Sequence, residues 1–408
     1  MKTISLIRFV LAFALLIAHC PLVICQLTSN LKAHVTYLAS DSLHGRMTGS
    51  EDEHKAAAYI IEMFKKGGIT NLKQNLKSKK YLQAFRYHPK MDSIRTTVSG
   101  NNVIGFINNN AKHTIVIGAH YDHLGWGLPA HSTYRGELAI HNGADDNASG
   151  VATVIELAKL LKNSSYKKNN YLFIAFSGEE LGLYGSKWFV EHPRLDSSKI
   201  DYMLNFDMVG RVDSNKFVIS GTGTSSLWSE AMKQIQTPLR IKTTESGVGP
   251  SDHTSFYLKN IPVLHFFSGQ HKDYHKPSDD EYKINYKGME DVIDYVMKLI
   301  EELDSKGKIG FTKTKDDNNE DAPKFTVTLG VMPDYTYEGE GMRIDGVTEG
   351  KPASKAELKE GDVVIQLGEV KVNDMMSYMK ALSQFRKGDT AKVKVKRGSE
   401  MLERDINF

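Results

Sequence analysis

Five short segments of this chain carry carboxylate or imidazole side chains of the kind that hold a hydrolytic metal. They are His120-Tyr121-Asp122, Asp145-Asp146, Glu179-Glu180, Asp207 and Tyr274-His275. Three of them closely follow apolar runs that indicate buried strands, at residues 114–118, 171–176 and 200–206. Ligands gather beyond the carboxyl ends of the strands in an open α/β sheet, so one pocket could hold all five segments. The pattern therefore indicates an enzyme.

The first two segments each have a functional and a purely structural interpretation. The imidazole of His120 could ligate a metal while the carboxylate of Asp122 holds its other ring nitrogen and fixes the tautomer. A His–Asp hydrogen bond in a turn is the alternative. Asp145 stands in a loop before an amphipathic helix, and its two oxygens could bridge cations roughly 3.5–4 Å apart. Helix capping is the alternative there, because Asp, Asn and Ser are preferred at helix starts.

The next two segments are harder to explain without a metal. Glu179 and Glu180 are adjacent carboxylates in a glycine-rich loop, and their mutual repulsion calls for cations or a division of labour. One could ligate while the other takes a proton from water. A solvated charge pair is the alternative. Asp207 lies in an apolar segment and needs a metal, donors or an ion pair, for which Arg211 is a candidate.

The last segment adds an imidazole and a phenol. His275 could supply a nitrogen ligand, and the hydroxyl of Tyr274 could stabilise a tetrahedral oxyanion. A second His/Asp pair, Asp252-His253, is expected to support the site and not to ligate.

The elements that position these residues alternate between helical and strand-like patterns. Apolar residues recur at helical spacing in four segments, which predict helices at 51–66, 149–162, 225–236 and 286–303. Further strands are expected at 217–221 and 263–267. The fold class is therefore α/β, with a mostly parallel sheet flanked by helices. The polar, glycine-interrupted stretch 305–323 lacks core-forming residues and predicts a linker.

Residues 1–25 have the pattern of a signal peptide. Basic residues precede an apolar stretch that His19 and Pro21 interrupt, so it is too short for a membrane span. We expect cleavage after Cys25 and export to the periplasm or the medium. A lipoprotein anchor on Cys25 is the second interpretation, which Ile24 disfavours because such signals have a small residue there. Cys20 and Cys25 are the two cysteines of the chain, so the mature protein would hold no disulfide.

Charge and hydropathy exclude two classes of partner. The net charge is +3 and no basic stripe is present, which argues against nucleic acid. The remainder of the chain has no long apolar run, so we expect no membrane span in the mature protein.

In their joint order, the motifs resemble the zinc peptidase family of bacterial leucyl aminopeptidases, aminopeptidase Y and glutamate carboxypeptidases. The resemblance covers roughly residues 31–303, which implies a zinc peptidase domain at 26–304. It rests on the strings GAHYDHLG, NGADDNASGVA, FSGEELGLYGS, NFDMVGR, SDHTSFY and YHKPSDD. It implies a secreted metallo-exopeptidase, with an aminopeptidase favoured because a free α-amine suits a carboxylate cluster.

The resemblance also implies a role for each site residue. One of two Zn²⁺ ions would be held by His120 and Asp207, the other by Glu180 and His275, and Asp145 would bridge them. Glu179 would be the general base, Asp122 would orient His120, and Tyr274 would stabilise the oxyanion. The peptide bond between Asp145 and Asp146 is expected to be strained or cis.

Residues 324–408 resemble a PDZ domain, most specifically in the string GKPASKAELKEGDVVIQLG. Such domains bind an extended C-terminal peptide as an added strand and hold its carboxylate with backbone N–H groups. The carboxylate loop is expected at Leu329-Gly330-Val331, and the far wall of the groove at the helix 375–385. A small barrel that merely packs against the first domain is the alternative.

Two other functions remain open from the sequence. A glutaminyl cyclase-type acyltransferase shares the expected fold but works with a single zinc. A non-catalytic peptide-binding scaffold would use only the second domain, and the complete set of candidate ligands argues against it.

Overall fold

The computed structural model describes most of the chain. The described residues are 26–72, 81–87, 97–127, 132–134, 136–314, 327–334, 337, 339–348, 350–373 and 375–408. The expected signal peptide with both cysteines, and the linker stretch 315–323, lie outside the described residues. In the described part of the chain, no helix is long and apolar enough to cross a membrane.

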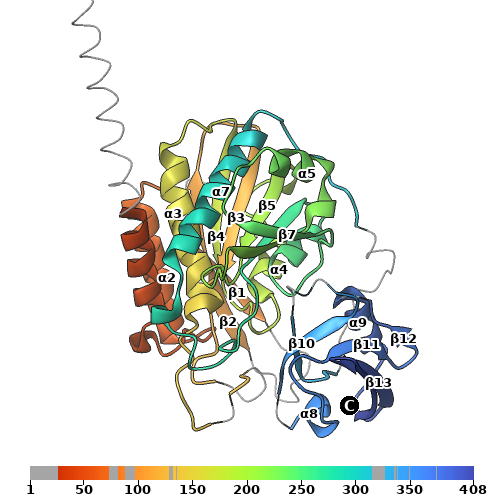
Figure 1. Ribbon diagram of the computed structural model, residues 1–408. Coiled ribbons are helices and arrows are strands. Elements are labelled where there is room, and N and C mark those ends of the chain that lie inside the picture. Colours follow the sequence, from red (N-terminus) through yellow and green to blue (C-terminus); the bar gives the residue numbers. More distant parts are fainter. Residues whose placement is uncertain are drawn as a thin grey trace, which may run out of the picture.

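An eight-stranded sheet forms the centre of the first domain, with strand order β1-β2-β4-β3-β5-β8-β6-β7 (Figure 1). The strands are β1 (Leu82–Tyr87), β2 (Val98–Ile107), β3 (His113–His120), β4 (Asn169–Phe176), β5 (Ile200–Phe206), β6 (Lys216–Ser220), β7 (Arg240–Thr244) and β8 (Val263–Phe267). The central pairs β4-β3, β3-β5 and β5-β8 are parallel, as is β6-β7. The expected mostly parallel α/β sheet is confirmed.

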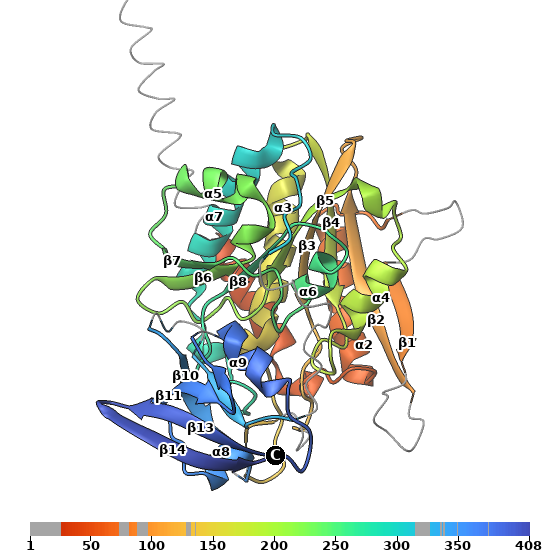
Figure 2. The ribbon, with the colours of Figure 1, turned by 90° about the vertical axis from the view of Figure 1, so that its right-hand side faces the viewer.

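Helices cover both faces of this sheet (Figures 1 and 2). One face packs against the helix at residues 26–38 and against α2 (Glu51–Lys66), α3 (Gly150–Asn163), α5 (Ser226–Lys233) and α7 (Tyr286–Asp304). The other face packs against α4 (Tyr184–Glu191) and α6 (His253–Tyr257). Short helical turns lie at η1 (Asp41–Leu43), η2 (Ala144–Ser149), η3 (Ser197–Lys199), η4 (Thr222–Thr224) and η5 (Glu281–Lys283).

Burial on both faces explains why the central strands are continuous apolar runs. All eight residues of β4 and all seven of β5 are buried. Along β4, Tyr171 and Phe173 belong to the core under α3 and α7, whereas Leu172 and Ile174 belong to the core under α4 and α6. Successive side chains alternate between the two faces, so both faces require mostly apolar residues.

The second domain has its own small sheet and its own apolar core. Its elements are β9 (Val331–Pro333), β10 (Met342–Val347), α8 (Pro352–Lys355), β11 (Val363–Leu367), β12 (Val370–Lys371), α9 (Met375–Leu382), β13 (Thr390–Arg397) and β14 (Glu400–Asn407). The strand order is β14-β13-β11-β10-β9, with β12 paired to β11. Leu329, Ile344, Val364 and Val395 are among the fully buried residues of this core. As the last strand in this order, β9 lies at an edge of the sheet.

The first half of the expected linker does not behave as a tether. Ile309 is 2% exposed and belongs to the large core, and its N–H donates to Asp201 Oδ1 at 2.7 Å. Thr314 is buried, and its hydroxyl lies 2.9 Å from the hydroxyl of Tyr257. Residues 305–314 thus dock on the first domain, although their polar composition did not predict it.

This docking predicts a difference between two truncated chains. A chain that ends at Thr314 should keep the burial of Ile309 and its hydrogen bonds, whereas one that ends at Ser305 should lose them. Burial of one large aliphatic side chain contributes about 1.5–3 kcal/mol. We therefore expect the shorter chain to be less stable by at least about 2 kcal/mol in guanidinium denaturation. Equal midpoints would contradict a stabilising role for residues 305–314.

Candidate metal centre

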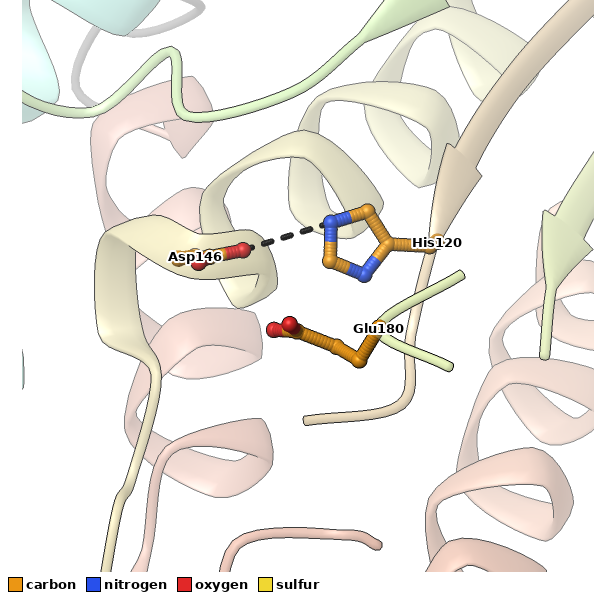
Figure 3. Close-up of side chains that lie close together, drawn as sticks. All are labelled: His120, Asp146 and Glu180. Carbon is orange, nitrogen blue, oxygen red and sulfur yellow. Dashed lines mark ion pairs between the residues drawn. The ribbon is translucent and has the colours of Figure 1, made fainter. Parts of the chain in front are cut away.

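The chemically suited residues meet at the carboxyl ends of the central parallel strands. His120 ends β3, Glu180 follows β4, Asp207 follows β5, and Asp146 lies in the turn η2. Figure 3 shows His120, Asp146 and Glu180 pointing toward one another. One ligand atom from each of these three residues lies within 4.8 Å of the others. The topology therefore brings together side chains that are far apart in the sequence.

Asp146 lies at the middle of the cluster. Its Oδ1 is 3.2 Å from Nε2 of His120, and its Oδ2 is 3.2 Å from Nε2 of His275. On one side, Asp207 Oδ1 lies 3.3 Å from the same nitrogen of His120. On the other, Glu180 Oε2 lies 3.1 Å from Nε2 of His275. The cluster thus has two halves, each with one imidazole and one carboxylate, and a carboxylate common to both.

The structure corrects the residue that was expected to bridge. The carboxylate of Asp145 is directed elsewhere, since its Oδ1 accepts from the Gly210 N–H at 2.6 Å and from Ser149 Oγ at 3.0 Å. Its Oδ2 lies 3.1 Å from His271 Nε2. The cis peptide bond is likewise one residue later than expected, between Asp146 and Asn147. The expectation was wrong by one residue because either of two adjacent aspartates could face the site.

The donor set fits zinc. Two imidazole nitrogens and three carboxylates converge, and the side chains of these five residues are at most 14% exposed. Zinc takes this mixture of nitrogen and oxygen ligands and tolerates open coordination positions. Carboxylates packed this closely away from water need compensating positive charge.

The electrostatics show how strongly the cluster demands positive charge. Burial alone would lower the pKa of His120, but the carboxylates of Asp207, Glu179 and Asp146 outweigh it and raise that pKa well above its ordinary value. The pKa of His275 is likewise raised, because Glu180 and Asp146 outweigh its burial. A bound metal cation would supply this positive charge, and it would require neutral imidazole nitrogens as ligands.

The adjacent glutamates differ in their surroundings. Burial would raise the pKa of Glu180, but His275 and His123 hold it at about 2. Burial raises the pKa of Glu179 well above its ordinary value, and the nearby carboxylates of Asp207 and Glu180 add to the shift. Glu179 also lines the open cavity, while the Glu180 side chain is 5% exposed. Their environments thus support ligation by Glu180 and proton transfer by Glu179.

Asp122 supports the site differently from the expectation. The Nδ1 of His120 lies 3.2 Å from the backbone carbonyl oxygen of Asp122 and 3.8 Å from its carboxylate. The carboxylate instead accepts from Thr48 Oγ1 at 2.7 Å and from the Glu179 N–H at 3.2 Å. Asp122 therefore orients His120 through its backbone and positions the Glu179 loop through its side chain.

Tyr274 and the second His/Asp pair line or flank the cavity. The ring of Tyr274 stacks on His275 with a centroid separation of 3.8 Å, and both line the cavity. His253 is buried and stacks on His265 at 4.4 Å. Burial lowers the pKa of His265 to about 4 and raises that of Asp252 to about 7. Neither Asp252 nor His253 belongs to the metal-type cluster found among the described residues.

Three supporting residues were missed by the sequence reasoning. His123 is buried with its Nδ1 2.7 Å from Glu180 Oε1, and its place in GAHYDHLG was the available signal. Asp279 Oδ2 accepts from the N–H groups of Asp145 and Asp146 at 2.9 and 3.0 Å. Arg46 is buried and donates to the backbone carbonyls of four residues, which are Leu38, Tyr121, Asn142 and Gly143. A lone arginine gave no sequence signal for that role.

Arg211 is not the partner of Asp207 that the sequence left open. Its guanidinium donates to Asp273 Oδ2 at 2.7 Å. Asp273 also accepts from Lys283 Nζ at 2.8 Å and from Ser278 Oγ at 2.7 Å. Despite burial, these donors hold the pKa of Asp273 far below its ordinary value. The arrangement fixes the loop that carries His275.

A cavity of about 840 Å³ opens at the cluster, and His120, Asp146, Glu179, Asp207 and His275 line it. This volume lies within the roughly 300–1,000 Å³ of ligand pockets. A substrate larger than a single amino acid can therefore reach the metal-type cluster.

Family models match both parts of the chain. Residues 102–300 match the model described as peptidase family M28, and residues 307–408 match that of the PDZ domain. Among curated relatives, aminopeptidase YwaD of Bacillus subtilis is 28% identical over 277 residues, which are 65% of this chain and 53% of YwaD. The chain spans about half the length of the curated relatives that it matches first, at 52% and 53%.

Two solved structures show the same fold. The LapA aminopeptidase of Legionella pneumophila superposes with a TM-score of 0.52 at 22% identity, over 68% of this chain and 71% of LapA. The glutaminyl cyclase of Porphyromonas gingivalis superposes with a TM-score of 0.54 at 17% identity, over 68% of this chain and 98% of the cyclase.

The position of Asp146 predicts the outcome of a matched pair of substitutions. Asp146→Asn removes the charge between the two imidazoles and should lower the zinc content of the dialysed protein, measured by atomic absorption. Asp145→Asn alters a carboxylate bound to Gly210, Ser149 and His271, so it should keep the wild-type zinc content. The reverse result would restore Asp145 as the ligand.

The pKa of Asp273 predicts a pH-dependent stability difference. Its folded-state pKa lies below its unfolded value of about 3.9, so the carboxylate stabilises the protein above that pH and loses this effect as the pH falls toward the folded pKa. Asp273→Asn should lower the unfolding free energy by about 1.5–3 kcal/mol at pH 7, as for hydrogen bonds to charged groups. The deficit should shrink below about pH 4. A deficit that stays constant in chemical denaturation between pH 7 and pH 3 would contradict this origin.

Proposed function

We propose that this chain, which consists of a peptidase family M28 domain followed by a PDZ domain, is a zinc aminopeptidase that hydrolyses N-terminal residues from peptides. The observation that carries the proposal is Asp146, whose carboxylate lies between the imidazoles of His120 and His275, with Glu179 on the cavity wall beside them. Such a metal site, together with a group that moves a proton, is one arrangement that hydrolyses a peptide bond.

We infer two zinc ions from the number of donors. His120 and Asp207 would hold one ion, Glu180 and His275 the other, and Asp146 would touch both. Five donors with a shared carboxylate exceed what one tetrahedral ion takes. When bound, zinc supplies a lowered pKa for water and polarises the scissile carbonyl.

The protein's own residues perform the remaining steps. The carboxylate of Glu179 takes a proton from the attacking water and returns it to the leaving amine. Its raised pKa suits both transfers, because a base of very low pKa would hold the proton too weakly to deliver it. Tyr274, on the cavity wall beside His275, is positioned to stabilise the oxyanion.

An aminopeptidase agrees with the charge of the site. The carboxylates of Glu179 and Asp207 line the cavity and favour a protonated α-amine close to the scissile bond. YwaD and LapA, which are named as aminopeptidases, support this choice over a carboxypeptidase.

We also propose that the protein acts outside the cytoplasm. The signal-peptide pattern of residues 1–25 supports export to the periplasm or the medium. A lipoprotein anchor at Cys25 would leave the same domains exported.

The function is tested with the zinc-loaded full chain and three kinds of substrate. We expect hydrolysis of leucyl p-nitroanilide and of unblocked peptides, and no hydrolysis of N-acetylated peptides. Glu179→Gln should keep the zinc content but lose roughly 10²–10⁴-fold in kcat, as for removal of a general base. Loss of zinc in this variant would show that Glu179 is a ligand instead.

The same assay separates the rival functions. A glutaminyl cyclase would release ammonia from a peptide with N-terminal glutamine and leave its peptide bonds intact. A scaffold would bind peptides without releasing any product. Either result would refute the aminopeptidase.

A further inference from the structure

The cavity at the metal centre does not end within the first domain. Its lining continues onto the PDZ domain, where six of the residues concerned are Thr328, Gly330, Val331, Pro333, Lys351 and Met379. Figures 1 and 2 both place the PDZ domain beside the end of the large sheet that carries β6 and β7. The peptide groove and the metal centre therefore share one continuous space.

The part of the PDZ domain that faces this space is its strand-adding groove. β9 pairs with β10 on one side only, so its other edge can accept an added strand. Val331 and Pro333 line the cavity from β9, and Met379 lines it from α9 across the groove. An extended peptide beside β9 would thus run along the wall of the same cavity.

The start of β9 brings Lys351 close to the loop that was expected to hold a carboxylate. Gly330 has a φ of +77°, and a Cβ at this position would lie 2.1 Å from Cβ of Lys351. Glycine is therefore required for the close approach of Lys351 to the loop. Among the described residues, no carboxylate forms an ion pair with Lys351, so its ammonium can pair with a ligand's carboxylate.

A direct contact closes the wall between the two domains. Nζ of Lys242, on the edge strand β7, donates to the backbone carbonyl oxygen of Tyr337. Lys242, Thr244 and Tyr337 all line the cavity. This hydrogen bond joins the two domains at the wall of the cavity.

We propose that the PDZ groove is a subsite of the peptidase and binds the C-terminal carboxylate of the same peptide whose N-terminus lies at the metal centre. The preferred substrates are then short peptides that are free at both ends. This proposal rests on the aminopeptidase function. The charges along the cavity match a zwitterionic peptide, with Glu179 and Asp207 at the amine end and Lys351 at the carboxylate end.

Phe408 does not line the cavity. The N–H of Phe408 donates to the carbonyl of Asp389 at 2.9 Å, and its carbonyl accepts from the Gly388 N–H at 2.8 Å. Its ring stacks on Phe385 with a centroid separation of 5.0 Å. Phe408 is therefore held next to the start of β13.

The test compares one leucine-initiated pentapeptide as its free acid and as its C-terminal amide. With the zinc-loaded full chain, we expect kcat/KM to be about tenfold higher for the acid, mainly through KM, which corresponds to about 1.4 kcal/mol. Lys351→Glu should abolish this preference. Lys355→Glu, an exposed residue of α8 outside the cavity, makes the same charge change and should preserve it. Each variant is compared by its own ratio of kcat/KM for the acid to kcat/KM for the amide. A general loss of folding or catalysis lowers both values and leaves this ratio unchanged.

The outcomes distinguish this proposal from the proposed function. If neither the peptides nor leucyl p-nitroanilide are cleaved, the aminopeptidase function itself fails. If the anilide is cleaved but wild type treats acid and amide equally, only the subsite is refuted. Equal effects of Lys351→Glu and Lys355→Glu would also refute it, because they would show that net charge alone causes the preference.

An N-acetylated peptide acid should compete with the free pentapeptide. If it instead accelerates anilide hydrolysis without competing, the groove serves a separate partner.

Discussion

The structure depends on one electrostatic constraint, which is the concentration of carboxylates in a space largely closed to water. Asp146, Glu180 and Asp207 meet two imidazoles within hydrogen-bonding distance at the ends of β3, β4 and β5. Ionised carboxylates are costly to bury together unless positive charge lies between them. The rigid parallel sheet holds these side chains together around that charge. Its strand ends converge at one edge, and packing on both faces fixes their positions.

Residues outside the cluster hold its loops in place against the repulsion between these carboxylates. Arg46 is buried and donates to carbonyls of the loops around Tyr121 and Asn142, and burial lowers its pKa to about 10, so it remains charged at neutral pH. Asp279 fixes the backbone N–H groups on both sides of the Asp145–Asp146 bond. These contacts satisfy polar groups that would otherwise be left unpaired in the interior, and they orient the ligands as outer partners of metal sites do.

Sequence reasoning predicted those features that follow from periodicity and from residue type. Largely apolar runs gave β5 and β8 at their observed bounds, and their order along the chain gave the mostly parallel sheet. It named Asp145 where the structure places Asp146, because the choice depends on local backbone dihedrals that composition does not encode. It also missed the docking of Ile309, since a single apolar residue in a polar stretch carries no periodic signal. Arg46 was also missed, because its partners are backbone carbonyls, which any residue type can supply.

The shared cavity changes what the second domain can contribute to catalysis. A tethered module raises only the local concentration of a substrate. A groove continuous with the metal centre also selects the orientation and the length of the bound peptide. Binding energy from the carboxylate end can then order the peptide along its whole length before the bond at the other end reacts. Such ordering requires the domains to keep a fixed relation, and the hydrogen bond from Lys242 to Tyr337 is one attachment that contributes to it. The docking of residues 305–314 on the first domain also shortens the stretch of chain that joins the two domains.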